Sequence, residues 1–151
     1  MKITDFLRKE FVDPELKART KQEVVNELIG LLVQAKKLPK REEAVKVIME
    51  REKLGSTGIG QGIAIPHAKV QGLKEILIVF GRSLAGVEFD SLDGEPVHLI
   101  FLLLSPPEAT ENLKILARIS RLLKDRFLQQ ALKKAKNKEE IFNLIEEEEE
   151  G

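Results

Sequence analysis

The feature that most constrains the fold is an apolar run in the second half of the chain. Residues 97–104, V-H-L-I-F-L-L-L, form the most apolar stretch of the sequence, and residues 76–80, I-L-I-V-F, form a second run. Both have the length of strands, and neither shows the regular alternation of a half-exposed strand. Strands of this kind need cover on both faces, so the run at 97–104 predicts a central strand in a layered α/β domain.

Amphipathic segments on either side of these runs can supply the cover. Thr20 with Glu23, and Asn137 with Glu140, form capping boxes that predict helix starts. Helices are predicted over residues 3–10, 20–39, 40–54, 110–124, 127–135 and 137–145. The sequence therefore predicts one domain over residues 1–145. Five consecutive glutamates follow and repel one another, so residues 146–151 are expected to form an acidic, frayed tail.

Composition excludes several classes of function. Lysine plus arginine number 25 and aspartate plus glutamate also number 25, so no overall field attracts nucleic acid. The chain has no cysteine and only two histidines, so we expect no metal site and no cofactor. No stretch approaches the roughly 18 apolar residues of a spanning helix, and the N-terminus lacks the apolar run of a signal peptide. We therefore expect a cytoplasmic protein that does not insert into a membrane.

A glycine-rich stretch, G-S-T-G-I-G-Q-G-I-A-I-P-H, leads to His67. In an extended chain Gly58, Gly60 and Gly62 share one side, which leaves bare backbone that an anion or another element can approach. The nucleotide-binding templates do not fit, because the spacing is G-x-G-x-G, the stretch follows a predicted helix, and no G-K-[ST] follows. Taken alone, the three glycines fit close packing as well as anion binding.

His67 is the candidate nucleophile. A lone histidine near apolar residues is more often structural, but this one follows Pro66, which stiffens the backbone that presents it. A neutral imidazole can attack phosphorus directly, and a nearby cation with free backbone N–H groups would stabilise the transferred phosphoryl group. Arg51 and residues 57–62 are the candidates for this role. The alternative for Arg51 is a purely electrostatic role at the end of its helix.

These residues resemble the EIIA phosphocarrier domains of the bacterial phosphoenolpyruvate phosphotransferase system, in the fructose/mannitol and nitrogen-regulatory group. The segment E-R-E, followed by G-S-T-G-I-G-Q-G-I-A-I-P-H-A-K, is similar to the active-site motif of that family. F-D-S-L-D-G-E-P-V-H-L-I-F-L-L-L is similar to its second signature block. The likeness covers nearly the whole chain. It implies an α/β fold with a single mixed β-sheet of about five strands and helices packed on both faces.

The resemblance also implies the site. His67 would be phosphorylated at Nε2 by the phosphocarrier HPr or its nitrogen-branch equivalent, with Nδ1 oriented by a backbone carbonyl, and Arg51 falls on the active-site arginine. The expected phosphate-binding residues are Thr57, Gly58, Gly60, Gln61, Gly62 and Asn112. Asn112 stands where the family commonly has a histidine; its amide cannot titrate but can donate an N–H. Gln61 replaces a common asparagine, and His98, at a position often acidic in relatives, is expected to be structural.

Three functions remain open at this point. In a nitrogen-regulatory EIIA, phosphorylation of His67 switches binding to a regulatory target protein. In a sugar-specific EIIA, the group passes to an EIIB domain for sugar uptake. A regulatory binding module without phosphoryl transfer is the third. The start M-K-I-T-D-F-L resembles stand-alone nitrogen-type members, which favours the first function slightly.

Overall fold

A computed structural model of the protein describes residues 1–150. Its centre is a six-stranded mixed sheet in the order β1-β5-β6-β3-β2, with β4 also paired to β6. The strands are β1 (Leu7–Asp13), β2 (Gly58–Gly60), β3 (Ile63–Ala64), β4 (His67–Lys69), β5 (Leu77–Val87) and β6 (Val97–Ser105). β6 pairs antiparallel with β5 and parallel with β3 and β4. The prediction of a central strand at 97–104 is confirmed.

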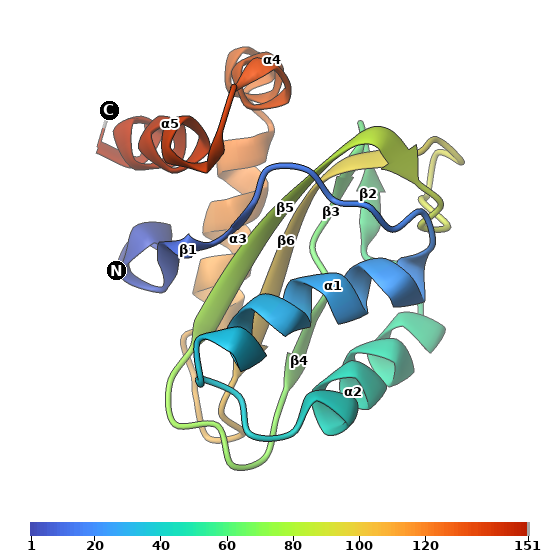
Figure 1. Ribbon diagram of the computed structural model, residues 1–151, viewed down its shortest axis with the longest axis vertical. Helices are drawn as coiled ribbons and strands as arrows, with labels where there is room; N and C mark the ends of the chain where they lie inside the picture. Colours follow the sequence, from blue (N-terminus) through green and yellow to red (C-terminus); the bar gives the residue numbers. More distant parts are fainter. Residues whose placement is uncertain (151) are drawn as a thin grey trace.

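Helices cover both faces of this sheet, as expected (Figure 1). They are a short 3-10 helix η1 (Ile3–Asp5), α1 (Lys21–Gln34), α2 (Arg41–Lys53), α3 (Asn112–Leu123), α4 (Arg126–Lys134) and α5 (Lys138–Glu150). Figure 1 shows α1 and α2 on one face and α3 behind the other, with α5 beside η1 and β1 and α4 next to α5. The predicted caps are present, because Thr20 Oγ1 accepts from Glu23 N at 3.4 Å and Asn137 Oδ1 accepts from Glu140 N at 2.9 Å.

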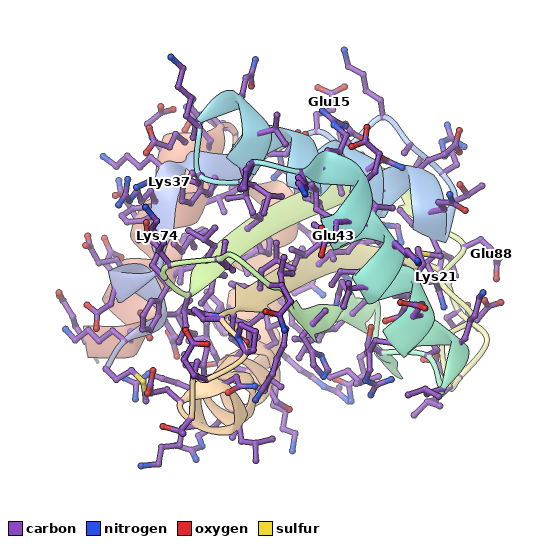
Figure 2. The ribbon with its side chains drawn as sticks, turned by 90° about the horizontal axis from the view of Figure 1, so that it is seen from below. Glu15, Lys21, Lys37, Glu43, Lys74 and Glu88 are labelled. Atoms are coloured by element: carbon purple, nitrogen blue, oxygen red, sulfur yellow. The ribbon has the colours of Figure 1, made fainter. Side chains whose placement is uncertain are left out.

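The core lies between the sheet and these helices. β5 and β6 are buried along most of their length, and the rings of Phe80 and Phe101 meet edge to face, 4.8 Å apart. Gly81 leaves room for α1, since a Cβ there would lie 2.6 Å from Leu28 Cδ2. Charged side chains such as Glu15 and Glu88 lie at the periphery (Figure 2).

Both ends of the chain differ from expectation. Residues 3–10 do not form one helix; β1 begins at Leu7 because pairing with β5 and burial of Leu7 outweigh helical preference. The prediction of a frayed tail is also wrong, because α5 continues through these glutamates to Glu150. The Glu149 carboxylate accepts hydrogen bonds from Ile3 N at 2.6 Å and Thr4 N at 3.1 Å. These specific partners outweigh the repulsion among the glutamates. Residue 151 lies outside the described residues.

Candidate active site

His67, Arg51 and Asn112 line one cavity of about 590 Å³. His67 begins β4, Arg51 lies in the last turn of α2, and Asn112 is the first residue of α3. The sheet holds these elements together, since β4 pairs with the central strand β6 and α2 packs against β4. Three of the residues singled out in the sequence therefore meet at one place.

The His67 ring is oriented by a single hydrogen bond. Its Nδ1 lies 2.8 Å from the carbonyl oxygen of Ile65, as the family resemblance implies. A carbonyl can only accept, so Nδ1 carries the proton and Nε2 of the neutral ring keeps its lone pair. The ring is half-buried at the cavity. This is the tautomer that a nucleophilic Nε2 requires.

Two cationic side chains face the same cavity. Arg51 uses one N–H to donate to Gly55 O at 3.0 Å, which leaves further guanidinium donors free. Lys69 Nζ donates to Pro107 O at 3.1 Å and so holds the segment that leads into α3. Glu50 also lines the cavity, so these three side chains together carry one net positive charge. Sequence reasoning missed Lys69, although its position two residues after His67 on the same side of a strand was an available signal.

The N-terminus of α3 adds backbone donors. The Glu111 side chain does not cap this helix, so its first N–H groups are not satisfied by a side-chain cap. Asn112 and Leu113 bring this end of α3 to the cavity. An uncapped helix N-terminus beside a lysine and an arginine favours an anion. The cavity can therefore hold a phosphoryl group against a neutral imidazole.

The glycine-rich stretch does not reach this cavity. None of Thr57, Gly58, Gly60, Gln61 and Gly62 lines it. β3 pairs with β6 at Leu99 and β4 pairs at Leu103, so four residues of extended chain, roughly 13 Å, separate the glycines from His67. The structure thus places these five residues outside the cavity that His67 lines, and phosphate binding by them stays a prediction.

The bare backbone of the stretch permits close packing at Gly58. A Cβ at Gly58 would lie 2.5 Å from Ser91 Oγ. Thr57 donates its hydroxyl to Glu52, whose carboxylate also accepts from Thr57 N at 3.2 Å and pairs with Lys21 at 3.0 Å. Glu52 is 6% exposed and fixes the turn after Arg51. The sequence alone had not singled out this buried carboxylate.

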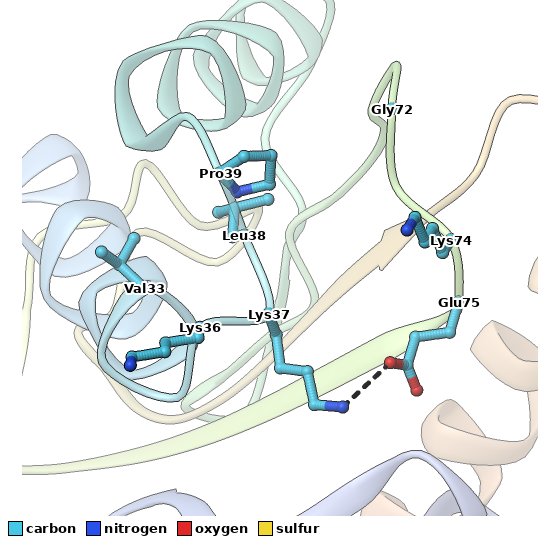
Figure 3. Close-up of a pocket in the computed structure, with 8 residues that line it drawn as sticks. All are labelled: Val33, Lys36, Lys37, Leu38, Pro39, Gly72, Lys74 and Glu75. Atoms are coloured by element: carbon cyan, nitrogen blue, oxygen red, sulfur yellow. Dashed lines mark hydrogen bonds and ion pairs between the residues drawn. The ribbon is translucent and has the colours of Figure 1, made fainter.

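Another cavity, of about 550 Å³, contains no candidate for phosphoryl transfer. Figure 3 shows its lysines, of which Lys37 reaches toward Glu75 and pairs with it at 3.1 Å. Lys36 and Lys74 are exposed, and none of the predicted site residues lies there.

Within residues 1–150, no group of three His, Cys, Asp or Glu side chains could hold a metal ion. No helix in that range is long and apolar enough to cross a membrane.

Comparison with known proteins gives a consistent result. Residues 5–148 match the family described as phosphoenolpyruvate-dependent sugar phosphotransferase system, EIIA 2. The chain is 40% identical to a nitrogen regulatory protein of Bradyrhizobium diazoefficiens, over 96% of this chain and 95% of that protein. It is 38% identical to the fructose-specific EIIABC component of Bacillus subtilis over 96% of this chain, but it spans only 23% of that longer protein.

Solved structures agree with the fold. The nitrogen regulatory protein IIA-Ntr of Neisseria meningitidis superposes with a TM-score of 0.88 at 32% identity, over 95% of this chain and 98% of that one. The mannitol enzyme IIA of Escherichia coli, solved in complex with phosphorylated mannitol enzyme IIB, superposes with a TM-score of 0.79 at 21% identity. That match covers 94% of this chain and 99% of the other, and it shows likeness of fold alone.

Proposed function

Because the chain belongs to the EIIA 2 family of the phosphoenolpyruvate-dependent sugar phosphotransferase system, we propose that His67 carries the phosphoryl group. Domains of this family are phosphocarriers, so the protein is a phosphotransferase in this general sense. The observation that carries the assignment is the hydrogen bond from Nδ1 to Ile65 O, which leaves Nε2 as a free nucleophile in a cavity with two cations.

The proposed donor is the phosphohistidine of HPr or an equivalent carrier. The Nε2 lone pair attacks phosphorus, the N–P bond of the donor breaks, and its electron pair returns to the donor imidazole. Nδ1 keeps its proton throughout, and the Ile65 carbonyl stabilises the positive charge of the phosphorylated ring. Arg51, an Asn112 N–H and the first amides of α3 offset the charge on the phosphoryl oxygens of a loose transition state.

Exposed apolar side chains beside the cavity support a protein as donor. Leu54 is 84% exposed and Leu113 is 78% exposed, and both line the His67 cavity. Large apolar side chains around a polar site are typical of protein interfaces. A carrier protein that docks on them brings its own phosphohistidine to Nε2. This exchange takes place in the cytoplasm in our proposal.

For the next step we favour the nitrogen-regulatory function, in which phosphorylated His67 controls binding to a regulatory target. The match to nitrogen regulatory proteins along almost their whole length supports it. The second candidate is transfer to an EIIB domain for sugar uptake. The fructose-specific relative and the mannitol complex of enzymes IIA and IIB support this alternative.

Incubation with phosphoenolpyruvate, Enzyme I and HPr tests the assignment. We expect one acid-labile phosphoryl group per chain, lost in His67→Ala and retained in His98→Gln, which alters the only other histidine. Label retained in His67→Ala would refute the assignment, and an unlabelled wild type would favour a regulatory module without transfer. Passage of the label to an EIIB domain would favour the sugar branch over the regulatory one.

A further inference from the structure

A second polar cavity, of about 460 Å³, lies away from His67. It is bounded by the turn between β2 and β3, by the loop that precedes β6, and by α4. It shares no lining residue with the His67 cavity. The proposed phosphoryl transfer leaves its side chains without a role.

The walls of this cavity carry opposite charges that do not pair. Arg126 and Lys133 lie seven positions apart on α4, so they share one face of the helix, roughly 10 Å from each other along its axis. Asp93 and Glu95 lie on the loop that forms the other wall. No salt bridge among residues 1–150 involves any of these four side chains. The cavity thus has two charges of each sign and no net charge.

Two hydrogen-bond acceptors at the cavity have no partner. Gln129 is 5% exposed, and its Nε2 donates to Leu123 O and to Gln61 Oε1, so its amide oxygen is left over. The donation to a carbonyl establishes which end of this side chain is the NH₂. His98 Nδ1 lies 2.8 Å from Ser83 O, so in the tautomer with the proton on Nδ1 the ring Nε2 is a second acceptor, and no described residue donates to either atom. Neither atom is buried, because Ser91 Oγ is the one buried side-chain atom without a partner among residues 1–150; both acceptors belong to residues that line the cavity and can accept from a ligand there.

The walls are held in place before any ligand binds. Buried Arg82 donates to Leu132 O at 2.9 Å and to Pro14 O at 2.9 Å, which anchors the end of α4 to β5. Asp93 accepts from Glu95 N at 3.0 Å and from Gln61 N at 3.1 Å. These backbone N–H groups lower the pKa of Asp93, so this carboxylate stays charged. The site is built by tertiary contacts and does not depend on surface side chains alone.

We propose that this cavity binds a free α-amino acid as its zwitterion. The carboxylate of the ligand lies against Arg126 and Lys133, and its ammonium group donates toward Glu95 and the unpartnered acceptors of Gln129 and His98. An inorganic anion would satisfy only the α4 wall and would face two carboxylates. A zwitterion matches both walls and adds no net charge. The cavity volume lies in the range of small-molecule sites.

The test is a titration of ¹⁵N-labelled protein with each standard free amino acid at millimolar concentration, followed by NMR. We expect at least one of them to shift the amide signals of Gln61, Glu95 and Gln129 to saturation. The N-acetyl amide of the same amino acid, which lacks both charges, should cause no such shift. No saturable shift with any amino acid, or equal shifts with the capped form or with inorganic phosphate, would overturn the proposal.

Neighbouring lysines on α4 provide a matched pair of variants. Lys133 lines the cavity and Lys134 does not. Lys133→Gln removes one charge-assisted contact and should weaken binding by about tenfold, and Glu95→Gln should have a similar effect. Lys134→Gln and His67→Ala should leave the affinity unchanged. Equal losses of affinity in Lys133→Gln and Lys134→Gln would show a general effect of charge and would contradict binding in this cavity. Because His67 does not line this cavity, the result of the amino-acid binding test does not depend on whether His67 carries a phosphoryl group.

Discussion

Replacing Arg51 with alanine tests whether the cation beside His67 acts on the transferred phosphoryl group. In the free protein Arg51 makes one exposed hydrogen bond, to Gly55 O at 3.0 Å. Losing such a bond costs about 0.5–1 kcal/mol of stability. The variant should therefore fold, and any large loss of activity has to come from the site itself.

The expected loss of rate follows from what remains in the cavity. Removing one preorganised donor from a developing anion typically lowers the rate by about 10²–10³-fold. Lys69 and the N-terminus of α3 still line the cavity in the variant. We therefore expect the lower end of this range, about 10²-fold, which corresponds to about 2.7 kcal/mol in the activation free energy.

Rapid-quench measurement of single-turnover transfer from phosphorylated HPr gives this rate directly. Lys53→Ala is the matched control, because Lys53 is a basic residue in the same last turn of α2, is exposed, and does not line the cavity. Thermal unfolding of both variants reports on the fold. A folded Arg51→Ala protein that transfers within about threefold of wild type would refute a catalytic role. Equal losses in both variants would do the same.

Two further predictions concern stability. Glu149→Ala leaves the N–H groups of Ile3 and Thr4 without their acceptor. Denaturant titrations should show that it lowers the free energy of unfolding by about 2–3 kcal/mol, whereas Glu147→Ala should change this free energy little. Similar values for the two variants would contradict the contact between the C-terminal end of α5 and the N-terminus. Burial raises the pKa of Asp13, so the folded protein binds this proton more tightly than the unfolded chain and loses stability as pH rises between the two pKa values. Asp13→Asn should therefore raise the midpoint of thermal unfolding at neutral pH and have little effect below about pH 4, and an equal shift at both pH values would disprove it.

Local patterns in the sequence predicted the main elements of the fold. The run at 97–104 became β6, and the capping boxes at Thr20 and Asn137 precede α1 and α5. Such patterns involve residues that are close in sequence, so they can be recognised without knowledge of the tertiary fold. The segment at 3–10 was misjudged because its partner strand β5 lies about seventy residues away.

The site divides in the same way. His67 could be singled out because a histidine after a rigid proline and bare backbone is a local pattern, and the motif around it led to the correct family. Lys69 and Glu52 were missed because their roles depend on contacts with Pro107 and Lys21, which lie on other elements. The tail was misjudged because the repulsion of its glutamates is visible in the sequence and the donors at the N-terminus are not.

The sequence by itself determined the family, the layered α/β fold and the identity of the candidate nucleophile. Only the tertiary structure decided which residues surround that nucleophile. Pairing with β6 places His67 at Leu103 and the glycine-rich stretch near Leu99, whereas the packing of α2 against β4 and the start of α3 bring Arg51 and Asn112 to the His67 cavity. The physical reason is that each residue of extended chain advances about 3.3 Å, so residues of one motif can lie beyond contact. Residues far apart in the sequence, at the end of α2 and the start of α3, line one cavity.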